Sequence, residues 1–183
     1  MYHSPWILFV KQIVCDCGFP GVWQSQSIPT GLDWFSNNIS QRLNGQFIQK
    51  YNSDIGNSPK AINYIMFKHT FQQENYLIDL PPGLWIPLCK FRCRNHRLPV
   101  EKFRQNSDDR NLRYCILCHT NEVGDEFHYL LKCPFFAEQL LLLLDNNICP
   151  NPSMHTFKNV MNTSGRKLIK IAKFIQIVLK KTK

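Results

Sequence analysis

The stretches Arg113-Tyr114-Cys115-Ile116-Leu117-Cys118 and His128-Tyr129-Leu130-Leu131-Lys132-Cys133 place four metal-ligand side chains in the pattern C-x2-C-x9-H-x4-C. Thiolate sulfur and imidazole nitrogen are the usual ligands of a four-coordinate, tetrahedral zinc ion. Four such side chains within nineteen residues are a stronger signal than one C-x2-C pair. The pattern therefore predicts a single zinc site with Cys115, Cys118, His128 and Cys133 as its ligands.

Local signals explain how the second ligand pair reaches the metal. Gly124 breaks the preceding loop, and Asp125 is suited to cap a short helix. His128 projects from this helix, and Pro134 ends it, so that Cys133 lies just beyond the last turn. Apolar residues at i, i+3 and i+4 give the helix one buried face, formed by Phe127, Leu130 and Leu131.

Other interpretations of these side chains remain open. Cys115 and Cys118 would also suit small core positions, with His128 on the surface. His119 is a competing ligand, although consecutive residues seldom point at the same ion. Cys89 and Cys93 lie one helical turn apart and with His96 suggest a second site. Packing on the apolar side of a helix is the preferred interpretation of that pair, because a fourth ligand is missing.

Composition and charge indicate the class of protein. The 183 residues are 44% apolar and 13% aromatic, enough for one core or for a core with a small appended module. The net charge is +9, and it is concentrated in two blocks. Residues 90–113 contain eight Lys or Arg and three acids, and residues 166–183 contain seven Lys or Arg and no acid. Such blocks are typical of surfaces that follow phosphates.

Targeting signals are weak. The apolar run from Trp6 to Val10 is too short for a signal peptide, so the eight cysteines are expected to be thiols or metal ligands in a reducing compartment. The predicted location is intracellular, in the cytoplasm, the nucleus or both, and not secreted. No apolar stretch reaches the eighteen residues of a membrane span. Residues 168–179 would suit a membrane surface, but a core-packing helix with a basic edge is preferred.

The spacing of apolar residues and the positions of Gly and Pro predict a mainly α protein, an irregular helical assembly with a small CCHC zinc-knuckle module. The expected division is a helical region over 1–104, the zinc module with its following helix over 105–150, and C-terminal basic helices over 151–183 that pack back on the core. Helices are expected over residues 5–17, 33–51, 60–69, 84–96, 135–145, 153–161 and 164–180, with loops over 19–31 and 52–59 and an extended segment over 98–100.

Ser153 and Ser164 are expected to cap the helices over 153–161 and 164–180. Two other helices carry specific burial predictions. The helix over 33–51 is expected to bury a stripe formed by Phe35, Ile39, Leu43 and Phe47. The leucine-rich helix over 135–145 is expected to be buried on most sides.

Several elements together resemble one family. They are Lys90-Phe91-Arg92, Asn95-His96-Arg97-Leu98-Pro99, Cys115-x2-Cys118, Glu122-Val123-Gly124-Asp125-Glu126-Phe127-His128-Tyr129-Leu130 and Cys133-Pro134. The sequence resembles the C-terminal region of reverse transcriptases from non-LTR (LINE-type) retrotransposons, whose zinc-binding segment follows the polymerase. The resemblance is most specific over residues 90–138. Cys93 and Arg94 depart from the smaller residues expected there, which concerns the local helix packing.

The resemblance implies the same four zinc ligands and binding of template RNA or target DNA during target-primed reverse transcription, beside an upstream polymerase domain. The polymerase needs paired aspartates on a hydrophobic hairpin. Asp108-Asp109 lies among polar residues and is interpreted as a solvated turn, so the chain is not expected to be an enzyme on its own.

The predicted function is therefore zinc-dependent nucleic-acid binding, with Tyr114 and Tyr129 as candidates for stacking on bases. The alternatives are a zinc-stabilised protein-interaction module and a non-functional retroelement remnant. The residues predicted to contact nucleic acid are Lys90, Arg92, Arg94, Arg97, Lys102, Arg104, Arg110 and Arg113.

Overall fold

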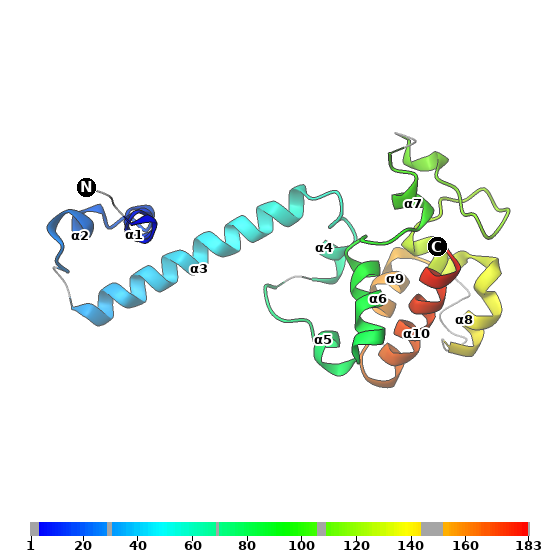
Figure 1. The fold of residues 1–183 in the computed structure, drawn as a ribbon. Coiled ribbons are helices and arrows are strands. Elements are labelled where there is room, and N and C mark those ends of the chain that lie inside the picture. Colours follow the sequence, from blue (N-terminus) through cyan, green and yellow to red (C-terminus); the bar gives the residue numbers. More distant parts are fainter. Residues whose placement is uncertain (1–3, 29–30, 69, 106–108, 144–151, 183) are drawn as a thin grey trace. The chain divides into compact units, whose positions relative to one another are not determined.

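The computed structural model describes residues 4–28, 31–68, 70–105, 109–143 and 152–182, and it is mainly helical (Figure 1). Within these ranges no β-strand is formed, and the one extended pairing is an antiparallel bridge between Tyr114 and Val123. The contacts divide the chain into two compact units, residues 1–54 and 55–183. The predicted mainly α fold is confirmed.

The first unit contains α1 (Pro5–Asp16), α2 (Pro20–Ser25) and most of α3 (Leu32–Asn57). Pro5 begins α1 at a position where its missing N–H costs nothing. Arg42 of α3 places its guanidinium over the Phe19 ring and donates a hydrogen bond to the carbonyl of Cys17. Cys17 is the one buried residue among those described in this unit. The unit is therefore held together by a few contacts around the ends of α1 and α2.

Two predictions for the first unit are wrong in part. The segment over 19–31 is not only a loop, because α2 forms within it, and α3 continues to Asn57 instead of ending near Tyr51. The predicted stripe is not buried: Phe35 and Ile39 are half-buried, and Leu43 and Phe47 are exposed. An apolar stripe is buried only where other elements cover its whole length, and two short helices cannot cover a helix of 26 residues.

The second unit holds the core. Its longest helix, α10 (Gly165–Lys181), packs against α6 (Pro82–Arg92) and α8 (Ala137–Leu143), as Figure 1 shows. α9 (Met154–Met161) packs against α4 (Tyr64–Phe67). The shorter elements are α5 (Tyr76–Asp79), α7 (Pro99–Lys102), the 3-10 turns Arg110–Leu112 and Pro134–Phe136, and a π-helical turn over His128–Lys132.

The C-terminal helices match their predictions in burial, but Ser164 makes no side-chain hydrogen bond as the expected cap of α10. Leu168, Ile171 and Phe174 are buried, and Lys170 and Lys173 are exposed on the opposite side of α10. Full burial of such apolar side chains stabilises the fold by about 1.5–3 kcal/mol each. Ser153 caps α9, because its Oγ accepts a hydrogen bond of 3.1 Å from the Thr156 N–H.

Other predictions for the second unit need correction. The expected helix over 60–69 is reduced to α4, and the one over 84–96 begins at Pro82 and ends at Arg92. Only Leu98 is extended, because Pro99 starts α7. In the leucine-rich helix, Leu140 is buried but Leu141 and Leu142 are 55% and 74% exposed, since α10 covers one side of α8.

The predicted boundaries fall differently from the two units. The one between residues 104 and 105 lies inside the second unit, and the one between 150 and 151 lies outside the described residues, as does the end of the leucine-rich helix at Asp145. None of the described helices combines the length and the apolar character needed to cross a bilayer.

Candidate metal centre

Four side chains from two separate segments meet in the second unit. Cys115, Cys118, His128 and Cys133 are all buried, and their ligand atoms lie within 4.8 Å of one another. The Sγ atoms of Cys115 and Cys133 are 3.9 Å apart, and Cys118 Sγ is 3.3 Å from His128 Nε2. This group could hold a metal ion, and it is the one such group among the described residues.

The distances fit a single four-coordinate ion. A tetrahedral centre with metal–sulfur bonds of about 2.3 Å places its sulfur atoms about 3.8 Å apart, and a sulfur and a nitrogen ligand about 3.5 Å apart. The two separations of 3.9 Å and 3.3 Å lie close to these values. Because all four ligands are at most 8% exposed, the site is closed on all sides. Closed sites stabilise structure, whereas catalytic sites keep an open position.

The first ligand pair lies at the start of a narrow loop. The bridge between Tyr114 and Val123 closes this loop, with hydrogen bonds from the Cys115 N–H to the Glu122 carbonyl and from the Gly124 N–H to the Arg113 carbonyl. These bonds are 2.9 Å and 2.8 Å long. The Leu117 N–H points back to Cys115 Sγ at 3.4 Å, which stabilises a sulfur that carries negative charge.

Gly124 is required for close packing of this loop on α7. A Cβ atom there would lie 2.8 Å from Pro99 Cγ and 3.1 Å from the Cys115 Cα. The Val100 N–H also donates to the Gly124 carbonyl at 3.2 Å. The residue therefore positions the first ligand pair against α7.

The second ligand pair comes from one helical turn. Asp125 Oδ1 accepts a 2.9 Å hydrogen bond from the His128 N–H, which confirms the predicted cap. The turn over His128–Lys132 is π-helical, and its last hydrogen bond runs from the Cys133 N–H to the His128 carbonyl. This wider turn brings the two ligands to the same side, and single π turns often occur at functional sites.

Glu122 supports the imidazole ligand. Its Oε2 lies 3.0 Å from His128 Nδ1, and its Oε1 accepts a hydrogen bond of 3.2 Å from Lys132 Nζ. The hydrogen bond with His128 holds the pKa of the Glu122 carboxyl below its usual range. A carboxylate on Nδ1 keeps the proton there and leaves Nε2 free to bind an ion. The pattern of metal ligands alone did not identify Glu122.

The thiols of the centre differ in acidity. Burial acts to raise the pKa of Cys118, but hydrogen bonds, chiefly with Thr120, outweigh it and lower the pKa to about 6. Burial raises the pKa of Cys133 to about 12. A bound cation would have to displace a proton from Cys133, so ion binding in this centre depends on pH.

Three of the eight basic residues predicted to contact nucleic acid are buried. Arg92 donates to the Met161 carbonyl at 2.6 Å and pairs with Glu74, and Arg113 donates to the Val100 carbonyl at 2.8 Å. Arg94 pairs with Glu126 and lies only 6% exposed. These guanidinium groups hold the fold together and expose little surface to a ligand, so their burial gives no support to the predicted contact with nucleic acid.

Arg94 belongs to a buried polar network that sequence reasoning missed. Glu126 is 1% exposed, and its Oε1 is 3.1 Å from Arg94 Nε and 2.8 Å from His96 Nε2. Asn63 donates to its other oxygen at 3.0 Å. Burial acts to raise the pKa of Glu126, but the hydrogen bond with His96 and the charge of Arg94 lower it. The Arg94 guanidinium also pairs with Glu101 at 3.3 Å.

The other five basic residues are exposed. Lys90, Arg97 and Lys102 reach solvent, Arg104 pairs with Glu101, and Arg110 pairs with Asp125. Of the two candidate stacking residues, Tyr114 is 43% exposed, whereas Tyr129 is fully buried and belongs to the core.

The alternative ligands stay apart from the centre. His119 is exposed, and His96 is engaged by Glu126. Cys89 on α6 and Cys93 at its C-terminal cap are half-buried, as the packing interpretation expected, and burial raises the pKa of Cys93 to about 11. Asp109 accepts a hydrogen bond from the Asn111 N–H in a turn, and Asp108 lies outside the described residues.

Comparison of the chain with protein-family models, with curated proteins and with solved structures gives no match.

Proposed function

We propose that the second unit is a zinc-stabilised nucleic-acid-binding module, similar in role to the segment that follows the polymerase in non-LTR retrotransposon reverse transcriptases. The observation that supports it is the closed group of Cys115, Cys118, His128 and Cys133 within a strongly basic part of the chain. The resemblance rests on the sequence elements over residues 90–138.

Zinc is the ion proposed for the centre. Three thiolates and one imidazole in a closed tetrahedral arrangement are a donor set found in structural zinc sites, and hard ions such as Mg²⁺ prefer oxygen. Bound zinc would join the loop over 113–124 to the π-helical turn and form a CCHC module of the knuckle type. In this role the ion fixes structure and needs no open coordination position.

The zinc proposal is tested by metal content. Purified, reduced protein is expected to contain one zinc per chain, and Cys133→Ser is expected to lose it. Cys15→Ser is the matched control, because Cys15 is a half-buried thiol on α1 of the first unit. Folded wild-type protein without zinc would contradict the proposal, and so would equal loss in both variants.

The proposed nucleic-acid surface consists of the exposed cations near the centre. Lys102 ends α7, which packs against Gly124, and Arg110 pairs with Asp125, the residue that caps the ligand turn. The metal centre thus fixes the backbone from which these cations project. Lysine and arginine side chains that neutralise phosphates give an affinity that falls as salt concentration rises.

The binding proposal is tested by titrating labelled single-stranded RNA and DNA at several salt concentrations. Neutralising three to five phosphates on a single strand predicts a log–log slope of roughly −2 to −3.5. A flat salt dependence would contradict the proposal. If RNA and DNA bind equally, contacts to the backbone dominate over contacts to the sugar 2′-hydroxyl.

A second candidate function, protein interaction, is favoured by the first unit. Trp6, Phe9 and Leu32 are 57–68% exposed there, although large apolar side chains usually gain by burial. An upstream polymerase domain is the partner that the resemblance suggests. Gel filtration of nuclease-treated protein separates the two candidates: self-association or a retained partner would support protein interaction, and a monomer would count against it. A non-functional retroelement remnant would show neither activity.

A further inference from the structure

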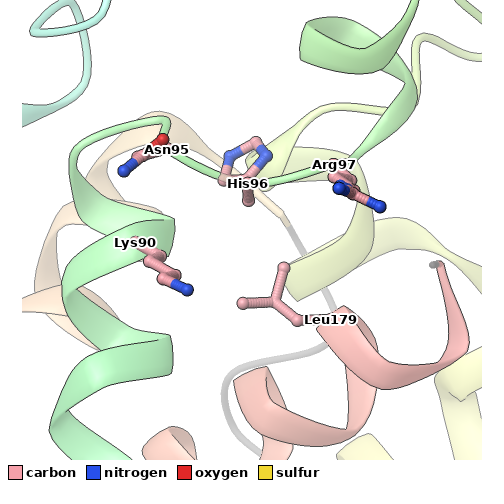
Figure 2. Close-up of a pocket in the computed structure, with 5 residues that line it drawn as sticks. All are labelled: Lys90, Asn95, His96, Arg97 and Leu179. Carbon is pink, nitrogen blue, oxygen red and sulfur yellow. The ribbon is translucent and has the colours of Figure 1, made fainter.

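An open pocket lies on the second unit, away from the four metal ligands. It has a volume of about 490 Å³ and is lined by Lys90 of α6, by Asn95, His96 and Arg97 of the following loop, and by Leu179 of α10 (Figure 2). This volume is within the range of sites that take small ligands or parts of larger ones.

The exposed polar groups around the pocket are hydrogen-bond donors, and two of them, Lys90 and Arg97, carry positive charge. Lys90, Asn95 and Arg97 are exposed, and Figure 2 shows Lys90 and Arg97 on opposite sides of the hollow with Leu179 between them. Among the described residues, no carboxylate lies within ion-pair distance of Lys90 or Arg97. Charge-assisted hydrogen bonds from such side chains are available to an anion.

Backbone hydrogen bonds fix the turn that carries Asn95 before any ligand arrives. The Asn95 N–H donates to the Lys90 carbonyl at 2.8 Å and the Arg94 N–H to that of Phe91 at 3.4 Å, the pair of bonds that ends a helix in a Schellman motif. Arg94 accordingly has a positive φ of 52°, which is uncommon for a residue with a side chain. The turn fixes Asn95 beside the last turn of α6.

Side chains of the loop after α6 point alternately toward solvent and into the unit. The His96 side chain is 1% exposed, and its Nδ1 accepts a hydrogen bond of 3.3 Å from the Leu98 N–H while Nε2 contacts Glu126. Both ring nitrogens therefore have hydrogen-bond partners, and the His96 ring lines one side of the pocket. Its neighbours Asn95 and Arg97 are exposed. A loop anchored in this way loses little conformational entropy when a ligand binds.

The surrounding charges favour an anion as the occupant. Glu126, the carboxylate that contacts His96, is buried and paired with Arg94, so its charge is compensated inside the unit. The exposed Lys180 and Lys181 follow Leu179 at the end of α10, a helix without acidic residues. The pocket therefore faces solvent with uncompensated positive charge, which attracts phosphates.

We propose that the pocket between Lys90, Asn95, Arg97 and Leu179 binds a phosphate group of a nucleic-acid strand. Lys90 and Arg97 contact the phosphate oxygens from two sides, Asn95 donates a further hydrogen bond, and Leu179 contacts the apolar part of the sugar. This inference rests on the proposed nucleic-acid-binding function and assigns it to one site.

The test compares two pairs of exposed cations in the zinc-loaded full chain. Lys90→Gln with Arg97→Gln removes the two pocket charges, and Lys170→Gln with Lys173→Gln removes two exposed charges of α10 that do not line the pocket. Binding of a labelled single-stranded oligonucleotide is measured by fluorescence anisotropy at several salt concentrations. The pocket pair is expected to weaken binding by about a hundredfold, about tenfold for each charge-assisted hydrogen bond. In the doubly substituted chain, the slope of log affinity against log salt concentration is expected to become shallower by roughly 1.4.

The outer pair is expected to weaken binding by less than about tenfold, because it removes long-range attraction without a fixed contact. Equal losses for both pairs would overturn the pocket as a site and leave only general attraction. Asn95→Asp places a carboxylate in the pocket without changing its size, and it is expected to weaken binding more than Asn159→Asp on α9.

A second measurement separates this site from the proposed function as a whole. If the wild-type chain binds no oligonucleotide, the proposed function fails, and inorganic phosphate is then titrated while backbone amide NMR signals are followed. Saturable shifts confined to residues 90–97 and Leu179 would show a pocket for a free phosphate group. Absence of such shifts, or equal shifts in the Lys90→Gln, Arg97→Gln variant, would overturn the pocket.

Discussion

The two units bury their apolar side chains very differently. In the second unit, the largest buried side chains include Phe91, Phe136 and Phe174, and Cys115, Cys118 and Cys133 belong to the same buried cluster. In the described part of the first unit, Cys17 alone is buried, and its aromatic residues lie in pairs such as Trp6 with Phe9 on the surface. Helices with an apolar face therefore form a core only where several helices pack against one another.

Removal of the proposed zinc should have the largest effect on this difference. Structural zinc supplies about 10–16 kcal/mol of apparent binding free energy at neutral pH, so chelation is expected to unfold the segment over 113–133 and to loosen the core. Hydrogen exchange measured by mass spectrometry should show lost protection in the second unit and unchanged protection in α1. Added zinc should restore it. Protection of residues 113–133 that persists after chelation would contradict the prediction.

Identical substitutions in the two units should have unequal effects. Phe174 is fully buried and packs edge to face on Phe136, so Phe174→Ala is expected to lower the free energy of unfolding by about 3–5 kcal/mol. Phe9 is 57% exposed, and Phe9→Ala is expected to change the free energy of unfolding by less than about 0.5 kcal/mol. Urea denaturation of both variants tests this contrast, and similar losses would show that the first unit has a core of its own.

The buried Glu126 network should make the second unit sensitive to acid. The pKa of Glu126 is lowered in the folded chain, so its contribution is fully present above the unfolded value of 4.5 and is lost as pH falls through the lower folded value. Glu126→Gln is expected to cost about 3 kcal/mol at neutral pH and to flatten the fall of stability in acid. Thermal unfolding of both proteins between pH 3 and pH 7, in roughly half-unit steps, measures the difference. If the two proteins lose stability in parallel as the pH falls, groups other than Glu126 cause the sensitivity to acid.

A smaller contrast lies between the two C-terminal helix caps. Ser153 accepts a hydrogen bond from the Thr156 N–H, whereas Ser164 makes no side-chain cap bond at the start of α10. Ser153→Ala is therefore expected to lower stability by about 1 kcal/mol, and Ser164→Ala by a few tenths. Thermal melts detect this difference, and a larger loss at Ser164 would contradict it.

The sequence predicted most accurately what depends on neighbouring residues. Asp125 caps the ligand turn, Ser153 caps α9, and α1 begins at Pro5, all as their local patterns indicate. The four ligands also converge as their spacing predicts. These features depend on contacts within one turn or one loop, where residue type and spacing largely decide the outcome.

Burial was predicted less well because it depends on which elements pack together. Leu43 and Leu142 have the periodicity of core residues, yet both are exposed, because neighbouring elements do not cover them. Arg92 and Arg94 belong to a basic block that is typical of a protein surface, yet both are buried. Periodicity describes one helix, whereas burial requires a second element at the right distance.

The sequence by itself determined the donor set of the candidate metal centre, the starts of α1, α9 and α10 and the basic character of residues 90–113. Only the tertiary structure decided which cations of that block face solvent. Glu74 and Glu126 lie 18 and 32 residues from the arginines that they pair with, and no local pattern indicates such partners. A buried guanidinium needs a carboxylate nearby to offset its lost hydration, so chain folding separates these internal charges from the exposed Lys90 and Arg97.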